Sequence, residues 1–355
     1  MTNAVSIAQG GSNNVTMRNR IINGAMVIDQ RNAGAAVTTD SAFPVDRFTT
    51  YEDTDGAYSA QRDTTAPTGF VNSLKWTTTT ADGSLSATQY AGIYQGIEGF
   101  NVADLGWGSA NAKTVTLSFW VRSSLTGTFG GSFRNNANNR SYPFTYSISV
   151  ADTWEQKTVT VSGDTSGTWT TDNTAGIKLF FSLGVGTTYS GTAGAWAGSN
   201  FLSATGAVSV IGTLNATFYI TGVQLEAGTT ATPFEQRLYG TELALCQRYY
   251  YKHTNNTISD PIANACYYNA TTMFGLLQFP VTMRTTPTIV QVTGTNYYRF
   301  YCNNGPDYFN NFGLEASSPT AYVFYNGTEM SGTAGQGGWV EMNNASGLLA
   351  FTAEL

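Results

Sequence analysis

Hydroxyl and amide side chains carry most of the polarity of this sequence, because only 11% of its 355 residues are Asp, Glu, Lys or Arg. Helix surfaces normally display Lys, Glu and Arg, whereas Thr and aromatic residues favour strands, and Ser and Asn favour turns. The 38 glycines and the 13% of aromatic residues agree with this pattern, and 41% apolar residues suffice for real cores. The composition predicts an all-β chain and excludes a helical bundle.

Alternating apolar residues mark the half-buried strands of the first 230 residues. A period of two places every second side chain on the same face of a strand. Three runs of this kind predict core faces: Val115, Leu117, Phe119 and Val121; Phe144, Tyr146, Ile148 and Val150; and Ile177, Leu179, Phe181, Leu183 and Val185. A run over residues 21–28 is also β-prone, and another spans residues 216–225. Turn residues between the runs indicate a β-sandwich rather than alternating strands and helices.

A short helical segment is expected between two β-rich regions. Thr232, Pro233 and Glu235 have the spacing of a capping box, and a second helical run is expected near Thr241. We therefore predict four parts: a tether at residues 1–18, a β-sandwich at 19–230, a helical linker at 231–252 and a smaller β-sandwich at 253–355. Runs at residues 297–301 and 321–325 are strands of the last part.

Charge excludes some partners. A formal net charge of −6 argues against nucleic acid, which requires a basic surface. Polar residues interrupt every apolar run, so no membrane insertion is expected, and the N-terminus has no secretory signal pattern. We expect a neutral or protein partner.

Catalysis has few residues to use in this sequence. His253 is the single histidine, and we expect it to be structural or at the surface. Cys246, Cys266 and Cys302 fit neither a disulfide framework nor a zinc site, and free buried thiols are expected. We predict no enzymatic activity, no cofactor and no metal site.

Several segments are similar to tailed-bacteriophage tail and fibre proteins. The sequences RIINGAM (20–26) and PVDRF (44–48) resemble the opening of these proteins, and VTLSFWVRS (115–123) resembles their carbohydrate-binding-module-like jelly roll. The most specific part is the join, with QLEAG (224–228), ATPFEQR (231–237) and ELALCQRYY (242–250). The resemblance covers about residues 19–252.

This resemblance implies a virion structural protein, made in the host cytoplasm and released by lysis, on the tail rather than the head. Its implied partners are other virion proteins and a host-surface polysaccharide or lipopolysaccharide, so the first expectation is a tail fibre or receptor-binding component. A head fibre or capsid decoration without glycan binding is the alternative. A glycan depolymerase is the minor one, with Asp46 and Glu98 as its acids.

Strand parity supplies the glycan-binding candidates, since sugars stack on exposed aromatic rings and bind planar polar groups. These candidates are Tyr94, Trp120, Arg122, Lys178 and Phe180. Packing beneath loops or at a subunit interface is an equally good interpretation of them. The low charge favours a neutral or amino-sugar-bearing glycan.

A homotrimer is expected, because the resemblance is to appendage proteins and the surface is poor in charge. The interface candidates are Leu243, Leu245, Tyr249, Tyr250 and Tyr251.

Overall fold

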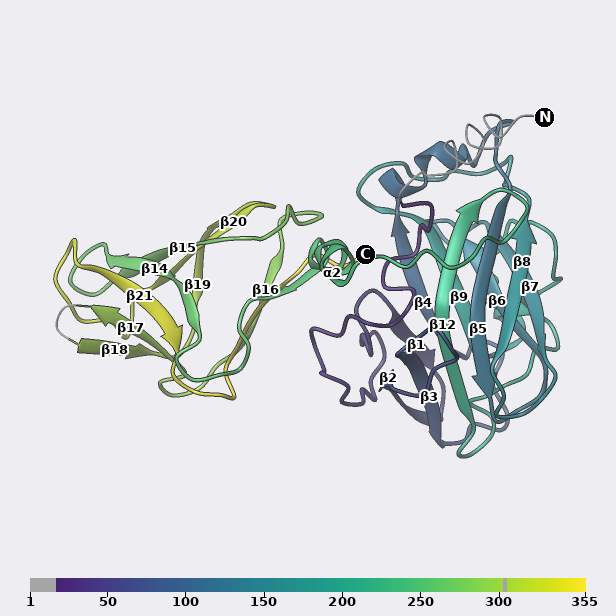
Figure 1. Cartoon of the computed structure of the whole chain (residues 1–355), viewed down its shortest axis with the longest axis horizontal. Coiled ribbons are helices and arrows are strands. Elements are labelled where there is room, and N and C mark those ends of the chain that lie inside the picture. The colour runs from purple at the N-terminus through teal and green to yellow at the C-terminus, as the bar shows by residue number, and fades with distance from the viewer. Residues whose placement is uncertain (1–16, 303–304) are drawn as a thin grey trace, which may run out of the picture. The chain divides into compact units, whose positions relative to one another are not determined.

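The structure, a computed structural model, describes residues 17–302 and 305–355 (Figure 1). The predicted tether therefore lies outside the described residues, apart from Met17 and Arg18. The chain divides into two compact units, Met1–Leu238 and Tyr239–Leu355. Strands dominate both units, so the prediction of an all-β chain is confirmed.

The first unit contains two five-stranded antiparallel sheets. One sheet has the order β1-β4-β9-β6-β7, with bounds Thr49–Asp53, Tyr90–Glu98, Ala175–Val185, Gly127–Arg134 and Ser141–Ile148. The other has the order β2-β3-β12-β5-β8, with bounds Ala57–Asp63, Ser73–Thr80, Thr217–Ala227, Val115–Ser123 and Glu155–Val161. From β4 to β12 the chain passes repeatedly from one sheet to the other, as in a jelly roll.

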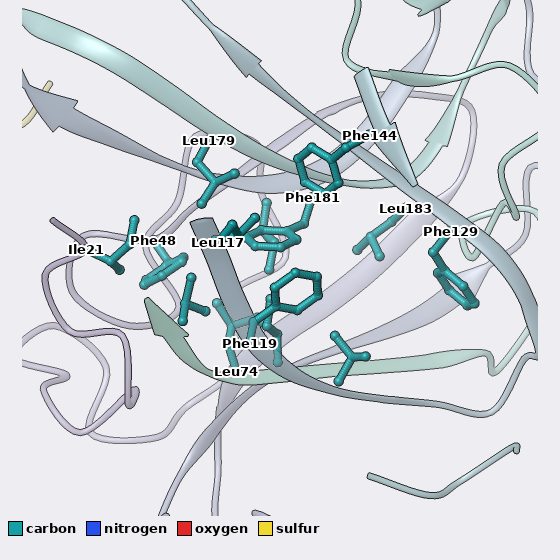
Figure 2. Close-up of a cluster of buried hydrophobic side chains, with 14 of the residues drawn as sticks. Ile21, Phe48, Leu74, Leu117, Phe119, Phe129, Phe144, Leu179, Phe181 and Leu183 are labelled. Atoms are coloured by element: carbon teal, nitrogen blue, oxygen red, sulfur yellow. The ribbon is translucent and has the colours of Figure 1, made fainter. Parts of the chain in front are cut away.

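A single apolar core lies between these sheets (Figure 2). The predicted inward faces are buried in it, and Phe119 of β5 packs edge-on against Phe181 of β9, with ring centroids 5.1 Å apart. Val150 and Val185 differ from the prediction. Val150 is exposed because β7 ends at Ile148, two residues earlier, and Val185, the last residue of β9, is only half-buried.

Residues 187–208 cross the outer side of β6 and β7. This segment contains η3 (Thr187–Tyr189), β10 (Ser190–Gly191) and β11 (Ser203–Ala204). Gly130 permits the approach, since a Cβ there would lie 2.1 Å from Ser203 Oγ. Two short 3-10 helices, η1 (Gly99–Asn101) and η2 (Ala103–Leu105), follow β4.

The strand predicted at residues 21–28 is wrong, because this segment is buried but irregular. Asn23 adopts a positive φ of 59°, and its side chain bonds the amide and carbonyl of Ile28 and the carbonyl of Asp46. This side chain satisfies backbone groups that a strand would pair in a ladder.

The helix predicted to start at Thr232 is also wrong. Helix α2 spans Tyr239–Gln247, which agrees with the second run expected near Thr241. The Glu235 carboxylate accepts bonds from the amides of Met17, Arg18 and Asn19 rather than capping a helix. Residues 232–238 are therefore bound to the first unit, and the two units divide after Leu238.

The second unit has its own sheets and core. A three-stranded sheet has the order β13-β22-β16, with bounds Tyr250–Lys252, Leu348–Thr352 and Thr288–Val292. A seven-stranded sheet has the order β18-β17-β21-β14-β15-β20-β19, with bounds Gly305–Phe309, Tyr298–Cys302, Gly337–Met342, Pro261–Tyr267, Met273–Gln278, Ala321–Asn326 and Gly313–Ser317. Strands β17 and β20 match the predicted runs.

No helix within residues 17–302 and 305–355 has the length and apolar character needed to cross a bilayer.

Candidate functional site

Aromatic side chains gather on the outer side of the sheet β1-β4-β9-β6-β7. Tyr51 of β1 stacks on Tyr90 of β4 with ring centroids 4.3 Å apart, and Tyr94 meets Tyr51 edge-on at 5.7 Å. Tyr189 of η3 meets Tyr90 edge-on at 5.4 Å. All four tyrosines are half-buried, so part of each ring remains accessible. We call these four residues the tyrosine face.

Strand register brings these rings together. Tyr94 lies opposite Phe180 of β9, and Tyr51 lies opposite Gly92 of β4. Phe180 is fully buried and meets Tyr51 edge-on at 6.0 Å, so it supports the tyrosines from below. Gly92 makes room for it: a Cβ at this position would lie 2.3 Å from Phe180 Cζ. The rings therefore form a layered platform.

Two cations lie beside the platform on neighbouring strands. Arg134 of β6 is directly opposite Lys178 of β9. The guanidinium carbon of Arg134 is 5.7 Å from the Phe180 ring and 5.9 Å from the Tyr51 ring, within cation–π range. Lys178 donates hydrogen bonds to the carbonyl of Asn136 and to Oδ1 of Asn138. The platform thus combines ring faces, cations and amides.

Burial shifts the pKa values of these groups. It raises the pKa of Tyr94 above its usual value, although Arg134 opposes the shift. It also raises the pKa of Tyr90, which is hydrogen-bonded to Tyr51. Both hydroxyls therefore keep their protons at neutral pH, and the Tyr94 hydroxyl can donate its proton to a ligand hydroxyl. Burial, with the charge of Arg134, lowers the pKa of Lys178 to about 8.

The five predicted glycan-binding residues divide between the two sheets. Tyr94, Lys178 and Phe180 lie together, although Phe180 is buried rather than exposed. Trp120 and Arg122 are on β5 in the other sheet, so they cannot contribute to the same platform. On that sheet Arg122 lies over the ring of Tyr219 at 5.2 Å and pairs with Asp152. We call Trp120, Arg122 and Tyr219, with Lys75, the Tyr219 face.

Trp120 lies beside a glycine on the neighbouring strand β12. A Cβ at Gly222 would lie 2.6 Å from Phe70 and 3.0 Å from Trp120, so both rings lie over this glycine. Gly222 has a φ of +62°, a conformation that L side chains rarely adopt. Trp120 is therefore half-buried beside the loop that carries Phe70.

The sequence analysis did not identify four residues of the tyrosine face and its adjoining cations: Tyr51, Tyr90, Tyr189 and Arg134. Arg134 follows the core residue Phe133 in β6, and Tyr51 follows Thr50, which lies opposite the core residue Ile93, so strand parity indicates that both point outward. Which strands are neighbours depends on sheet order, and no local pattern encodes the order β1-β4-β9-β6.

The acids proposed for hydrolysis are not accessible. Asp46 and Glu98 are each 1% exposed. Asp46 accepts bonds from the amide and side chain of Gln30 and pairs with Arg31 at 3.4 Å. These contacts give Asp46 a structural role. Within the described ranges, no group of three or more His, Cys, Asp or Glu residues is placed to hold a metal.

His253 has a structural environment. Its Nδ1 bonds the hydroxyl of Tyr251 at 2.7 Å, and its Nε2 bonds the carbonyl of Ile262 at 2.8 Å. Burial lowers its pKa. All three cysteines are free, as expected, but Cys266 is exposed, Cys302 is half-buried, and Cys246 alone is fully buried.

The predicted interface residues vary in exposure. Tyr249 and Tyr250 are buried, and Tyr250 lies in β13, where it pairs with Thr352 of β22. Leu243, Leu245 and Tyr251 are half-buried. Only these three offer appreciable surface to another copy, and the trimer stays a prediction.

The second unit carries a separate aromatic pair. Tyr301 and Trp339 stack with ring centroids 5.3 Å apart and an angle of 7° between their planes. Trp339 is exposed, and Arg299 lies over Tyr301 while pairing with Glu341. This pair is smaller than the tyrosine face.

No family model matches the sequence, and no curated protein matches it. Among solved structures, the enzymatically active domain of tailspike protein 4 from bacteriophage CBA120 aligns with 59% of this chain and 22% of its own, at 11% identity and a TM-score of 0.31. A putative sugar binding protein from Bacteroides thetaiotaomicron aligns over 59% of this chain and 100% of its own, at 13% identity and a TM-score of 0.32.

A family 11 carbohydrate-binding module from a cellulosomal cellulase of Clostridium thermocellum aligns over 57% of this chain and 100% of its own, at 13% identity and a TM-score of 0.29. Because these TM-scores are below 0.5, the likenesses assign neither a fold family nor a function.

Proposed function

We propose that the first unit binds carbohydrate through the tyrosine face. The observation that carries this proposal is the half-exposed cluster of Tyr51, Tyr90 and Tyr94, which is held in place by the buried Phe180. Ring faces of this kind stack on the C–H faces of sugars, and protonated phenol hydroxyls bond sugar hydroxyls.

The platform is built for recognition rather than cleavage. A glycosidase requires two carboxyl groups that flank the scissile bond. Asp46 and Glu98 are buried, so a polymer on the outer surface does not reach them. We therefore propose a binding module without hydrolase activity.

We further propose that this module belongs to a phage virion, on the tail rather than the head, and contacts host-surface glycans. The support is the sequence resemblance of residues 19–252 to tail and fibre proteins. Many copies on one particle would compensate for weak single sites, because linked sites raise avidity by factors on the order of a hundred or more.

A glycan array tests the binding proposal. The whole chain is applied to bacterial capsular polysaccharides, lipopolysaccharide O-antigens and teichoic acids, beside the variants Tyr94→Ala and Trp120→Ala. We expect binding that Tyr94→Ala weakens by about five- to thirtyfold, since a stacked ring contributes roughly 1–2 kcal/mol. Trp120→Ala, on the other sheet, should leave it unchanged. Binding that survives Tyr94→Ala but not Trp120→Ala would refute the assignment of the tyrosine face.

A further inference from the structure

The two cations beside the tyrosine face form an unusual pair. Arg134 and Lys178 occupy opposite positions on β6 and β9, and both point away from the core. Like charges directly opposite each other on a sheet are destabilising. An acidic side chain between them would relieve this repulsion, so the contacts of each cation are informative.

Arg134 is a buried cation without a carboxylate partner among the described residues. It is 3% exposed, its Nη1 donates to Oδ1 of Asn200 at 2.8 Å, and its other close neighbours are the rings of Tyr51 and Phe180. Its Nε is buried and has no hydrogen-bond acceptor. Burying a charge without an opposite charge beside it reduces the stability of the folded state, so the presence of Arg134 at this position requires an explanation.

Lys178 is likewise neutralised by no acid of the described chain. Its ammonium group contacts only the neutral oxygens of Asn136 and Asn138, at 3.0 and 3.2 Å. The lowered pKa of Lys178 has burial and the charge of Arg134 as its causes. Two cations thus lie together at a place where residues 17–302 and 305–355 supply no carboxylate partner to either of them.

A shortage of acids does not explain this arrangement, because the chain has 23 acids against 17 Lys and Arg. Several cations elsewhere on the first unit do have carboxylate partners. Examples are Arg20 with Asp104, Arg140 with Asp164, and Arg122 with Asp152. The absence of an acid beside Arg134 and Lys178 is therefore local.

Charge also differs between the two ends of the tyrosine face. Asp53 of β1 lies opposite Tyr90, and Asp53 and Asp40 contribute to the raised pKa of that tyrosine. Lys178 and Arg134 lie on β9 and β6, on the other side of β4. A ligand with a negative group would be oriented by these two ends, with that group toward β6.

We propose that the tyrosine face recognises an anionic glycan, whose carboxylate or phosphate binds at Lys178 with the charge of Arg134 beneath it. This inference rests on the proposed function and specifies its ligand class. It differs from the neutral or amino-sugar glycan expected from the sequence, because net charge is a sum over the chain and does not reveal two unpaired cations on one surface.

Matched polymers test the inference. Polygalacturonate and its carboxyl-reduced form differ only in charge along the same backbone, and glycerol-phosphate teichoic acid provides a phosphate. Affinity of the whole chain for each is measured by microcalorimetry at low and high salt, beside Lys178→Gln, Arg134→Gln and the control Arg122→Gln. Circular dichroism and the melting temperature establish that each variant is folded.

We expect at least about tenfold tighter binding to an anionic polymer than to the reduced polymer, weakening with salt. Lys178→Gln should remove this preference for the charged polymer, whereas Arg122→Gln, on the other sheet, should leave the affinities for both polymers unchanged. A preference for polygalacturonate identifies a carboxylate, and one for teichoic acid identifies a phosphate.

Equal affinity for charged and reduced polymers, or no binding of either anionic polymer, would overturn the inference. The proposed function has a separate test on the glycan array: it fails if no glycan binds, or if binding survives Tyr94→Ala but not Trp120→Ala.

Discussion

The two outer faces of the first unit use similar residues in different ways. On the Tyr219 face, Arg122 and Lys75 lie over one tyrosine ring at 5.2 and 5.5 Å, and each pairs with an acid, Asp152 and Asp63. On the tyrosine face, Arg134 lies over two rings, and none of the described residues places an acid beside it. The first arrangement is complete by itself, whereas the second has an unbalanced charge that a ligand can neutralise.

The two faces also differ in how far their tyrosine rings are buried. Tyr219 is buried beneath its cations and meets Trp154 edge-on at 6.1 Å. The tyrosines of the tyrosine face remain half-exposed, and the layer below them is Phe180. The same residue types thus form one surface whose charges are paired within the chain and another, half-exposed surface, which we propose binds glycan.

Gly92→Ala should have the largest effect on the tyrosine face. The new Cβ would lie 2.3 Å from Phe180 Cζ and 2.5 Å from the backbone oxygen of Phe181, which cannot rotate away. We expect a loss of about 2–3 kcal/mol in the free energy of unfolding, together with loss of glycan binding. Urea denaturation measures the first quantity. Gly198→Ala is the control, because nothing lies within 4 Å of its Cβ. Equal stability of the two variants would contradict the layered platform.

Arg134→Met should stabilise the protein, in contrast to most changes of buried residues. It replaces a buried charge without a carboxylate partner by an apolar side chain of similar length, and such replacements gain about 1 kcal/mol or more. The matched change Arg122→Met removes a partly exposed ion pair and should alter stability by less than about 1 kcal/mol. Urea denaturation of both variants without ligand provides the comparison. A large destabilisation by Arg134→Met would show that the cation is satisfied within the fold.

Lys178 should produce a small pH dependence of stability. The pKa of Lys178 is about 8 in the folded chain, compared with the usual value of 10.5 that applies to the unfolded chain. Below pH 8 the residue is charged in both states, and its burial penalty is fully present. Between pH 8 and 10.5 the folded state releases its proton before the unfolded state does, so stability rises with pH.

The difference in unfolding free energy between the wild type and Lys178→Met isolates this effect, because other titrating groups are common to both proteins. The wild type should gain stability relative to the variant from pH 7 to pH 10. If the unfolding free energies of the two proteins changed equally with pH over this range, Lys178 would be well solvated in the folded state, and the prediction would be wrong.

Local pattern was enough to predict most of the core but only part of the platform. Alternation identified the buried face of β5, and Phe119 and Val121 are fully buried there. It also placed Tyr94 and Lys178 outside the core. It could not show that Trp120 lies on a different sheet, because the sheet assignment depends on long-range pairing. Local pattern also gave a wrong prediction at Glu235. Its spacing from Thr232 fits a capping box, but its carboxylate accepts hydrogen bonds from the distant amides of residues 17–19.

A crystal structure of the whole chain with a glycan selected on the array tests the central claim most directly. The account predicts a sugar ring stacked on Tyr51 or Tyr94, with its negative group within about 4 Å of Lys178 Nζ. A sugar bound instead at the Tyr219 face, or on Tyr301 and Trp339 of the second unit, would contradict it.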